Sequence, residues 1–255
     1  MRKIMVFFSL LSVVILFFLT YPFVSLMLLA DPKLLGFTLS SATIIRALLL
    51  TLEAATLSTL ILMVFGVPLA YILARFEFRG KKLVEAITDL PLVIPHAVVG
   101  IMVLIAFGPK SPFSSILENI GVIIENSFWA IVAVFCFVGA PLLIDCAKDG
   151  FASIDPYLEG VARCMGAGAG RTFYTISLPL ASKSILTGAL LAWARSMSEV
   201  GALLIIAYYP KTINVLVIEW FNIYGLRYTV ALTLILLSIS IIVFVVLRWI
   251  LRWKH

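Results

Sequence analysis

The chain has 255 residues, of which 63% are hydrophobic and 13% are charged, and its mean hydropathy is +1.16. Soluble domains are typically about 45–50% apolar and about 25% charged, so a single soluble core could not hide this much apolar surface. The net charge of +6 would suggest nucleic acid as a partner of a soluble protein, but here the basic residues lie at the ends of apolar runs. There they bear on membrane orientation, and we expect no nucleic-acid partner.

Six apolar stretches are long enough to cross a bilayer core as helices, which takes about 20 residues each. These stretches show no period-two alternation, which favours helices over a transmembrane barrel. The expected fold class is therefore an all-α integral membrane protein, a bundle of six transmembrane helices in a single domain over 1–255. The expected spans are about 4–29, 44–74, 86–107, 127–147, 180–208 and 228–250.

The basic residues predict the orientation of these spans. The first stretch begins like a secretory signal, but its apolar run continues without a small-residue cleavage site, so we expect an uncleaved span. Thirteen of the 19 Lys and Arg residues fall on one side, which the positive-inside rule makes cytoplasmic. Both termini are then expected in the cytoplasm. The thirteen residues are Arg2, Lys3, Arg75, Arg79, Lys81, Lys82, Lys148, Arg163, Arg171, Lys183, Arg248, Arg252 and Lys254.

The third stretch, 86–107, is interrupted by Pro91 and Pro95. Proline lacks a backbone N–H and breaks or kinks a helix, so we expect this span to start with a broken turn. His96 directly follows Pro95, and two interpretations stay open for it. It either bonds the carbonyls that the break leaves free, or it acts as a pH-sensitive gate residue.

The longest cytoplasmic connection, 148–179, predicts a short amphipathic helix. Asp155 supplies a side-chain acceptor at the N-cap, and Pro156 follows at the first helical position. Gly166 is typical of a helix stop. Such a short helix is marginal alone in water, so it rests either on the ends of its own spans or on a partner protein.

This connection resembles the signature of ABC-importer membrane subunits, E-A-A-x-x-x-G followed by nine residues and then I-x-L-P. Gly166 and 176–179 match its second half, and the E-A-A triplet aligns with 160–162, the glutamate being displaced to Glu159. In that family the loop forms a coupling helix that sits in a cleft of the cytoplasmic ATPase. The resemblance therefore implies ATPase coupling by Asp155, Pro156, Glu159, Gly160, Val161, Ala162, Arg163 and Gly166.

Three further segments, 89–101, 193–202 and 207–210, resemble the molybdate/tungstate permeases, with the sulfate permeases as close relatives. The resemblance implies a prokaryotic cell-membrane protein that imports molybdate or tungstate, two copies pairing around a central path. Two ATP-binding subunits at the cytoplasmic face and an extracytoplasmic oxyanion-binding protein would serve them, with membrane lipid around the bundle. Another oxyanion such as sulfate is the nearest alternative, followed by a stand-alone secondary transporter, which would require internal repeats.

Arg195 and Glu199 stand at i, i+4 spacing in the fifth predicted span, so they share a helix face. A charged residue at the bilayer centre costs about 2.5–3.5 kcal/mol on insertion scales, which makes such residues rare and often functional. One interpretation is an ion pair that locks the bundle. The other places Arg195, Ser196, Ser198 and Glu199 along the translocation path, where the arginine briefly attracts a passing dianion.

A catalytic role finds no support in the sequence. The glycines of 166–172 are spaced by three residues and precede arginine, whereas a phosphate loop needs four residues and a lysine. The chain is therefore expected not to be an enzyme, ATP hydrolysis belonging to a separate subunit. Cys136, Cys146 and Cys164 lack metal-site spacing, and we expect neither a metal nor a cofactor.

Overall fold

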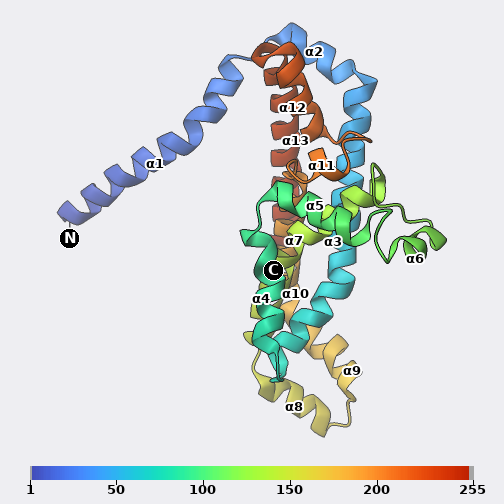
Figure 1. The fold of residues 1–255 in the computed structure, drawn as a ribbon. Coiled ribbons are helices and arrows are strands. Elements are labelled where there is room, and N and C mark those ends of the chain that lie inside the picture. The colour runs from blue at the N-terminus through green and yellow to red at the C-terminus, as the bar shows by residue number, and fades with distance from the viewer. Residues whose placement is uncertain (1, 253–255) are drawn as a thin grey trace.

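The computed structural model describes residues 2–252 as an elongated bundle of helices, and no strand occurs in that range (Figure 1). Within it, five helices are long and apolar enough to cross a membrane. The expected all-α membrane fold is thereby confirmed. The elements are α1 (Arg2–Leu28), α2 (Pro32–Ser40), α3 (Ala42–Arg75), α4 (Lys81–Val93), α5 (His96–Phe107), α6 (Ser114–Asn119), α7 (Phe128–Ala152), α8 (Pro156–Cys164), α9 (Ala169–Thr172), the π-helical turn η1 (Phe173–Ser177), α10 (Leu178–Met197), α11 (Leu203–Ile206), α12 (Ile213–Tyr224) and α13 (Leu226–Arg252).

Four predicted spans each coincide with one long helix, namely α1, α3, α7 and α13. The third predicted span is two helices, α4 and α5, which meet at Ile94 and Pro95. Ile94 is extended (φ −73°, ψ 130°), as expected for a residue whose α conformation clashes with the following proline ring. The break predicted from the prolines is therefore confirmed, and it sets α5 off as a separate short helix.

The predicted fifth span, 180–208, is wrong at its C-terminal end, because α10 stops at Met197. Polar side chains satisfy the backbone there. The Asn214 side-chain amide donates to the carbonyls of Met197 (2.6 Å) and Glu199 (3.1 Å), and the Glu199 carboxylate accepts from the Ala202 N–H (3.0 Å). A helix end needs such partners for its free groups. Hydropathy alone did not mark this end, since apolar residues continue through α11.

Helices α2 and α12 were not predicted. They lie at the end of the bundle opposite to α8 (Figure 1). Helix α2 begins with Asp31 and Pro32, the same start signal as in the cytoplasmic connection, and the Asp31 carboxylate accepts from the Lys33 N–H at 3.0 Å. It also accepts from Arg227 Nη2 at 3.0 Å, which ties α2 to the start of α13. This hydrogen bond holds the pKa of Asp31 below its usual range.

The core is formed by α3, α7 and α10, which pack closely along their lengths. Small residues allow this approach. A Cβ atom at Gly188 on α10 would lie 2.8 Å from Cys146 Cβ and 3.0 Å from Leu143 Cα on α7. Because lipid provides no hydrophobic drive between helices, close van der Waals contact at small residues is what holds such helices together.

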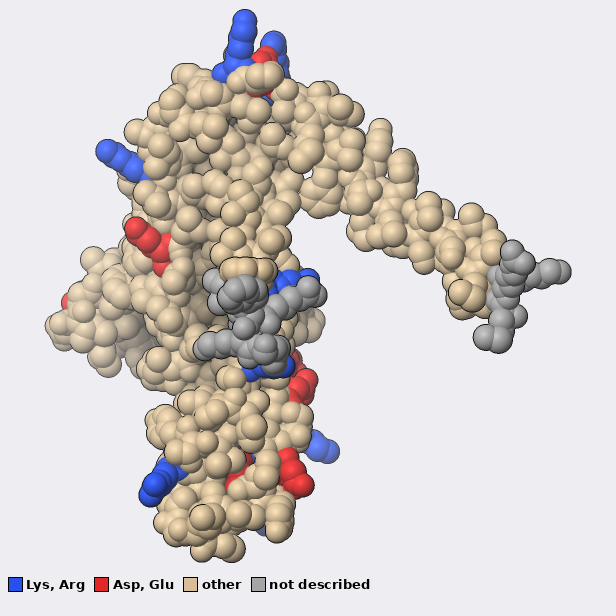
Figure 2. Space-filling view, turned by 180° about the vertical axis from the view of Figure 1, so that it is seen from behind, with Lys and Arg blue, Asp and Glu red and all other residues tan. Residues whose placement is uncertain are grey.

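Helix α1 differs from the other long helices, because none of the residues of its apolar window is buried within the chain. It leaves the bundle at the α2 end and extends away from it (Figure 1). On the face that Figure 2 shows, this arm carries no charged side chain among its described atoms. An apolar surface of this extent requires a cover of lipid or of another polypeptide.

We predict that Gly188→Val destabilises the bundle by about 1–3 kcal/mol, because the added side chain overlaps the α7 backbone. Gly36→Val on α2 is the matched control, since nothing lies within 4 Å of the position of its Cβ. The measurement is the thermal midpoint of the two purified variants in detergent, followed by tryptophan fluorescence. Equal midpoints for both variants and the wild type would show that α7 and α10 do not pack this closely.

Candidate functional site

The predicted cytoplasmic helix forms as α8, at one end of the bundle (Figure 1). The Asp155 carboxylate accepts from the Tyr157 N–H at 2.9 Å, and Pro156 occupies the first helical position. Gly166 has φ +88°, in the left-handed region, and its N–H donates to the Arg163 carbonyl at 2.9 Å. Both the start and the stop signals of this helix are therefore confirmed.

Glu159 points into the subunit, with only 5% of its surface exposed. Its Oε1 accepts from Arg75 Nε at 3.0 Å and from Ser177 Oγ at 2.8 Å. Its Oε2 lies 4.0 Å from Arg163 Nη2. The carboxylate is thus engaged by groups of its own chain, from elements on either side of α8 in the sequence.

The rest of the predicted coupling segment faces outward. Large apolar side chains are exposed on α8 and directly after it, including Tyr157, Val161 and Met165. Exposed apolar side chains gathered on one short helix are typical of a surface that another protein covers. Of the other residues implicated in coupling, Asp155, Pro156, Gly160, Val161, Arg163 and Gly166 are exposed and Ala162 is half-buried.

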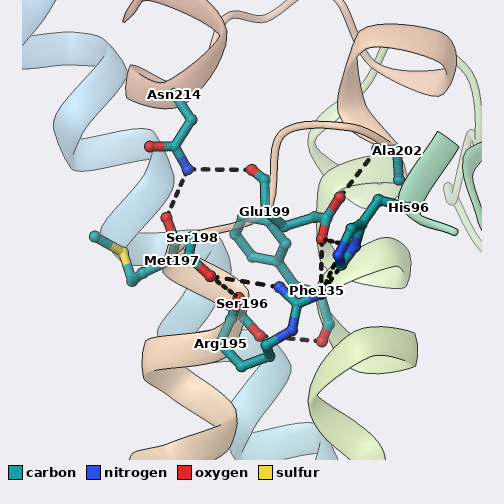
Figure 3. A network of polar contacts seen from close by, with 9 residues as sticks. All are labelled: His96, Phe135, Arg195, Ser196, Met197, Ser198, Glu199, Ala202 and Asn214. Atoms are coloured by element: carbon teal, nitrogen blue, oxygen red, sulfur yellow. Dashed lines mark hydrogen bonds and ion pairs between the residues drawn. The ribbon is translucent and has the colours of Figure 1, made fainter. Parts of the chain in front are cut away.

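The second group of interest surrounds Arg195 and Glu199, whose predicted contact is present at 3.2 Å between Nη2 and Oε2 (Figure 3). His96 joins them, its Nδ1 lying 2.8 Å from Glu199 Oε2 and 2.9 Å from Arg195 Nη2. His96 is the first residue of α5, so the break at Pro95 delivers this side chain to the end of α10. We call His96, Arg195 and Glu199 the central cluster.

The contacts of His96 Nδ1 compete with each other. A guanidinium nitrogen only donates hydrogen bonds, so Nδ1 must be unprotonated to accept from Arg195. Glu199 only accepts when it is ionised, so Nδ1 must carry a proton to donate to it. A ring that carries its proton on Nδ1 resolves this competition, because Nδ1 then donates to Glu199 while Nε2, 3.3 Å from Arg195 Nη2, accepts from the guanidinium.

The two serines next to Arg195 have different surroundings. Ser196 is fully buried, and its hydroxyl donates to the Phe135 carbonyl of α7 at 3.1 Å. In this conformation Ser196 therefore joins α10 to α7. Ser198 is exposed, and its hydroxyl oxygen lies 3.4 Å from Arg195 Nη1. The polar groups that reach the surface together are thus His96, Arg195 and Ser198. Sequence reasoning did not place His96 with Arg195, although the helix break beside it was a signal.

A cavity of about 480 Å³ opens at the α2 end of the bundle, lined in part by Arg46, Tyr209 and Trp220. Lys211 Nζ donates to Glu219 Oε1 there at 2.7 Å, and this hydrogen bond raises the pKa of Lys211. Over the residues that the structure describes, no three His, Cys, Asp or Glu side chains gather closely enough to hold a metal ion.

The sequence model of the family described as "Binding-protein-dependent transport system inner membrane component" matches residues 66–254. The chain belongs to this family. The molybdate/tungstate transport system permease protein of Pyrococcus abyssi is 51% identical over 219 residues, covering 86% of this chain and 83% of the relative. That of Methanocaldococcus jannaschii is 42% identical over 206 residues, covering 80% and 81%.

Solved structures give the same fold for this permease. A bacterial ABC transporter involved in the import of the acidic polysaccharide alginate aligns with a TM-score of 0.73 at 20% identity. The alignment covers 98% of the permease and 96% of that chain. The family match and the 51% identical relative confirm the family resemblance inferred from 160–179 and the three further segments, and the permease is a multi-pass membrane protein.

We predict that Glu199→Ala destabilises the permease by about 3–5 kcal/mol, because it leaves Arg195 and the Ala202 N–H without their buried partner. Glu199→Gln keeps an acceptor for Ala202 and should cost less. The control is Glu53→Ala, which removes an exposed carboxylate from α3. The thermal midpoint in detergent checks the order, and a Glu199→Ala variant as stable as Glu53→Ala would contradict it.

Proposed function

We propose that this permease forms the membrane path of an ATP-driven importer that moves molybdate or tungstate inward. The observation that carries the proposal is the 51% identity, over 86% of the chain, to a permease protein of a molybdate/tungstate transport system. ATP hydrolysis belongs to a separate cytoplasmic subunit. The exposed apolar side chains of α8 support this division, since they provide a surface for a partner at one end of the bundle.

The working assembly contains two copies of the permease, two ATP-binding subunits on α8 and its surroundings, and an extracytoplasmic oxyanion-binding protein at the α2 end. The charge distribution supports this orientation, because most Lys and Arg residues lie on the side of α8. Both termini then lie in the cytoplasm, and lipid or the second copy covers α1. A helix with no buried residue in its apolar window fits such a position.

The path carries the oxyanion past the central cluster without holding it tightly. Arg195 has five N–H donors, and its contacts with Glu199, His96 and Ser198 use only its Nη1 and Nη2 groups. Its side chain is 23% exposed, so a passing tetrahedral dianion can accept from it. Glu199 nearby limits the net attraction. Conduction requires binding that is weak enough to release the ion, and this arrangement provides it.

The proposal is tested by co-expressing the permease with a candidate ATPase subunit and capturing the pair through a tag on the permease. Proteoliposomes of the captured complex, supplied with a molybdate-loaded binding protein, should take up radiolabelled molybdate only when ATP is present inside. Tungstate should compete, and sulfate should not. Competition by sulfate at equal concentration would reassign the substrate. Uptake without any ATPase subunit would instead favour a secondary transporter.

We predict that Arg195→Gln lowers the initial rate of uptake about tenfold, since about 1.4 kcal/mol of lost attraction corresponds to that factor. Arg195→Lys keeps the charge and should retain most of the rate. Lys183→Gln is the control, because it removes an exposed basic residue of the same helix, α10, outside the central cluster. Folding is monitored by size-exclusion chromatography. Wild-type uptake by a well-folded Arg195→Gln variant would remove Arg195 from the path and leave it a packing role.

A further inference from the structure

We infer that Arg75 and Ser177 are positioning residues that fasten the coupling helix α8 to the membrane helices through Glu159. In this arrangement Glu159 transmits motion inside the permease and does not contact the ATPase. The inference rests on the proposed function, because it concerns the helix through which an ATPase would act. It assigns to Glu159, the displaced glutamate of the motif, a role within its own subunit.

The first observation is that few side chains of α8 other than Glu159 attach this helix to the bundle. Among its nine residues Glu159 is the only buried one, and no residue of α8 belongs to the hydrophobic clusters of the bundle. A short amphipathic helix is usually fixed by its apolar face. Here the apolar side chains face outward, so the side-chain attachment is a carboxylate.

The second observation is that Arg75 holds two points of the chain at once. Arg75 is the last residue of α3, and its Nη2 donates to the Ile154 carbonyl at 3.1 Å while its Nε donates to Glu159 at 3.0 Å. The first contact fixes the chain just before α8 begins, and the second fixes α8 itself. A planar guanidinium with donors in two directions suits such a clamp, whereas a lysine would not.

The third observation concerns Ser177, which is fully buried and donates to Glu159 Oε1 at 2.8 Å. Ser177 ends the π-helical turn η1 and directly precedes α10. Single π-helical turns inside helices are uncommon and are frequent at functional sites. Through Arg75 and Ser177 together, one carboxylate connects α8 to α3 and α10, which are two of the three core helices.

These contacts also leave Glu159 little capacity for an outside partner. Its Oε1 already has two donors, its Oε2 lies near Arg163, and its side chain is 7% exposed. A cation from an ATPase would have to displace Arg75 from a buried pair, which is costly. Polar contact with the ATPase therefore falls to exposed groups such as Arg163, whose side chain is 54% exposed.

The test uses the assembled complex in proteoliposomes and measures molybdate taken up per ATP hydrolysed. Arg75→Gln and Glu159→Gln should each lower this ratio about tenfold, because either change breaks the same buried pair. The exchange of both charges, Arg75→Glu with Glu159→Arg, should raise the ratio above that of either single variant but below that of the wild type, because it re-forms the ion pair and not the hydrogen bond to the Ile154 carbonyl. Ser177→Ala should have an intermediate effect.

The matched control is Glu77→Gln, which breaks the exposed Lys81–Glu77 pair in the connection that directly follows Arg75. Its ratio should equal that of the wild type. ATPase capture is measured for every variant, so that a defect in docking is separated from a defect in coupling. A merely structural role for the pair would lower uptake and hydrolysis together and leave their ratio unchanged.

The inference is overturned if Glu159→Gln abolishes ATPase capture while Arg75→Gln retains wild-type capture and ratio, since Glu159 would then contact the ATPase. A folded charge-exchange variant whose ratio is no higher than that of the single variants would also overturn it. Should the single variants fail to fold, Ser177→Ala, which removes no charge, provides the test. A wild-type ratio of molybdate taken up per ATP hydrolysed in this variant would then overturn the inference. Absence of ATP-dependent uptake by the wild type would instead refute the proposed function itself.

Discussion

The structure depends on one constraint, namely that hydrocarbon offers no hydrogen bonds to the backbone and no solvation to a charge. Long helices such as α3 and α7 meet it by themselves. Wherever a helix stops inside the bundle, side chains must take over. At the end of α10, Asn214 and Glu199 bind the groups that the helix leaves free. The buried carboxylate of Glu199 then needs a cation, which Arg195 supplies, and His96 Nδ1 lies beside it.

Helix α10 has a carboxylate joint at each end. Directly before α10, Ser177 donates a hydrogen bond to Glu159. Near the end of α10, Arg195 donates to Glu199. Between these joints, close contact at Gly188 keeps α10 fixed against α7. A rigid element that is jointed at both ends suits the transfer of a displacement from the partner surface on α8 to the central cluster. This close packing leaves α10 little freedom to bend between them.

Much of the fold follows from the apolar run lengths, and the ends of α8 follow from Asp155, Pro156 and Gly166. The end of α10 does not, because 202–208 is as apolar as the helix before it, and only the later Asn214 reveals the stop. The inward direction of Glu159 depends on Arg75, 84 residues away, which no local pattern connects to it. The different surroundings of Ser196 and Ser198 could have been predicted from the sequence, since residues two apart point to different sides of a helix.

Apart from a short contact with α13, helix α1 takes no part in the internal packing of its subunit, and the family match begins only at residue 66, well past it. Within one copy, the membrane therefore constrains the length and hydrophobicity of α1, and away from that contact no neighbouring helix constrains the shapes of its described side chains. Such a segment is an exchangeable anchor. Exchanging one apolar residue of α1 for another removes no buried contact, whereas an exchange where α3, α7 and α10 meet does. In the laboratory, the amino terminus ahead of α1 is accordingly the natural attachment point for a fluorescent fusion or an affinity handle.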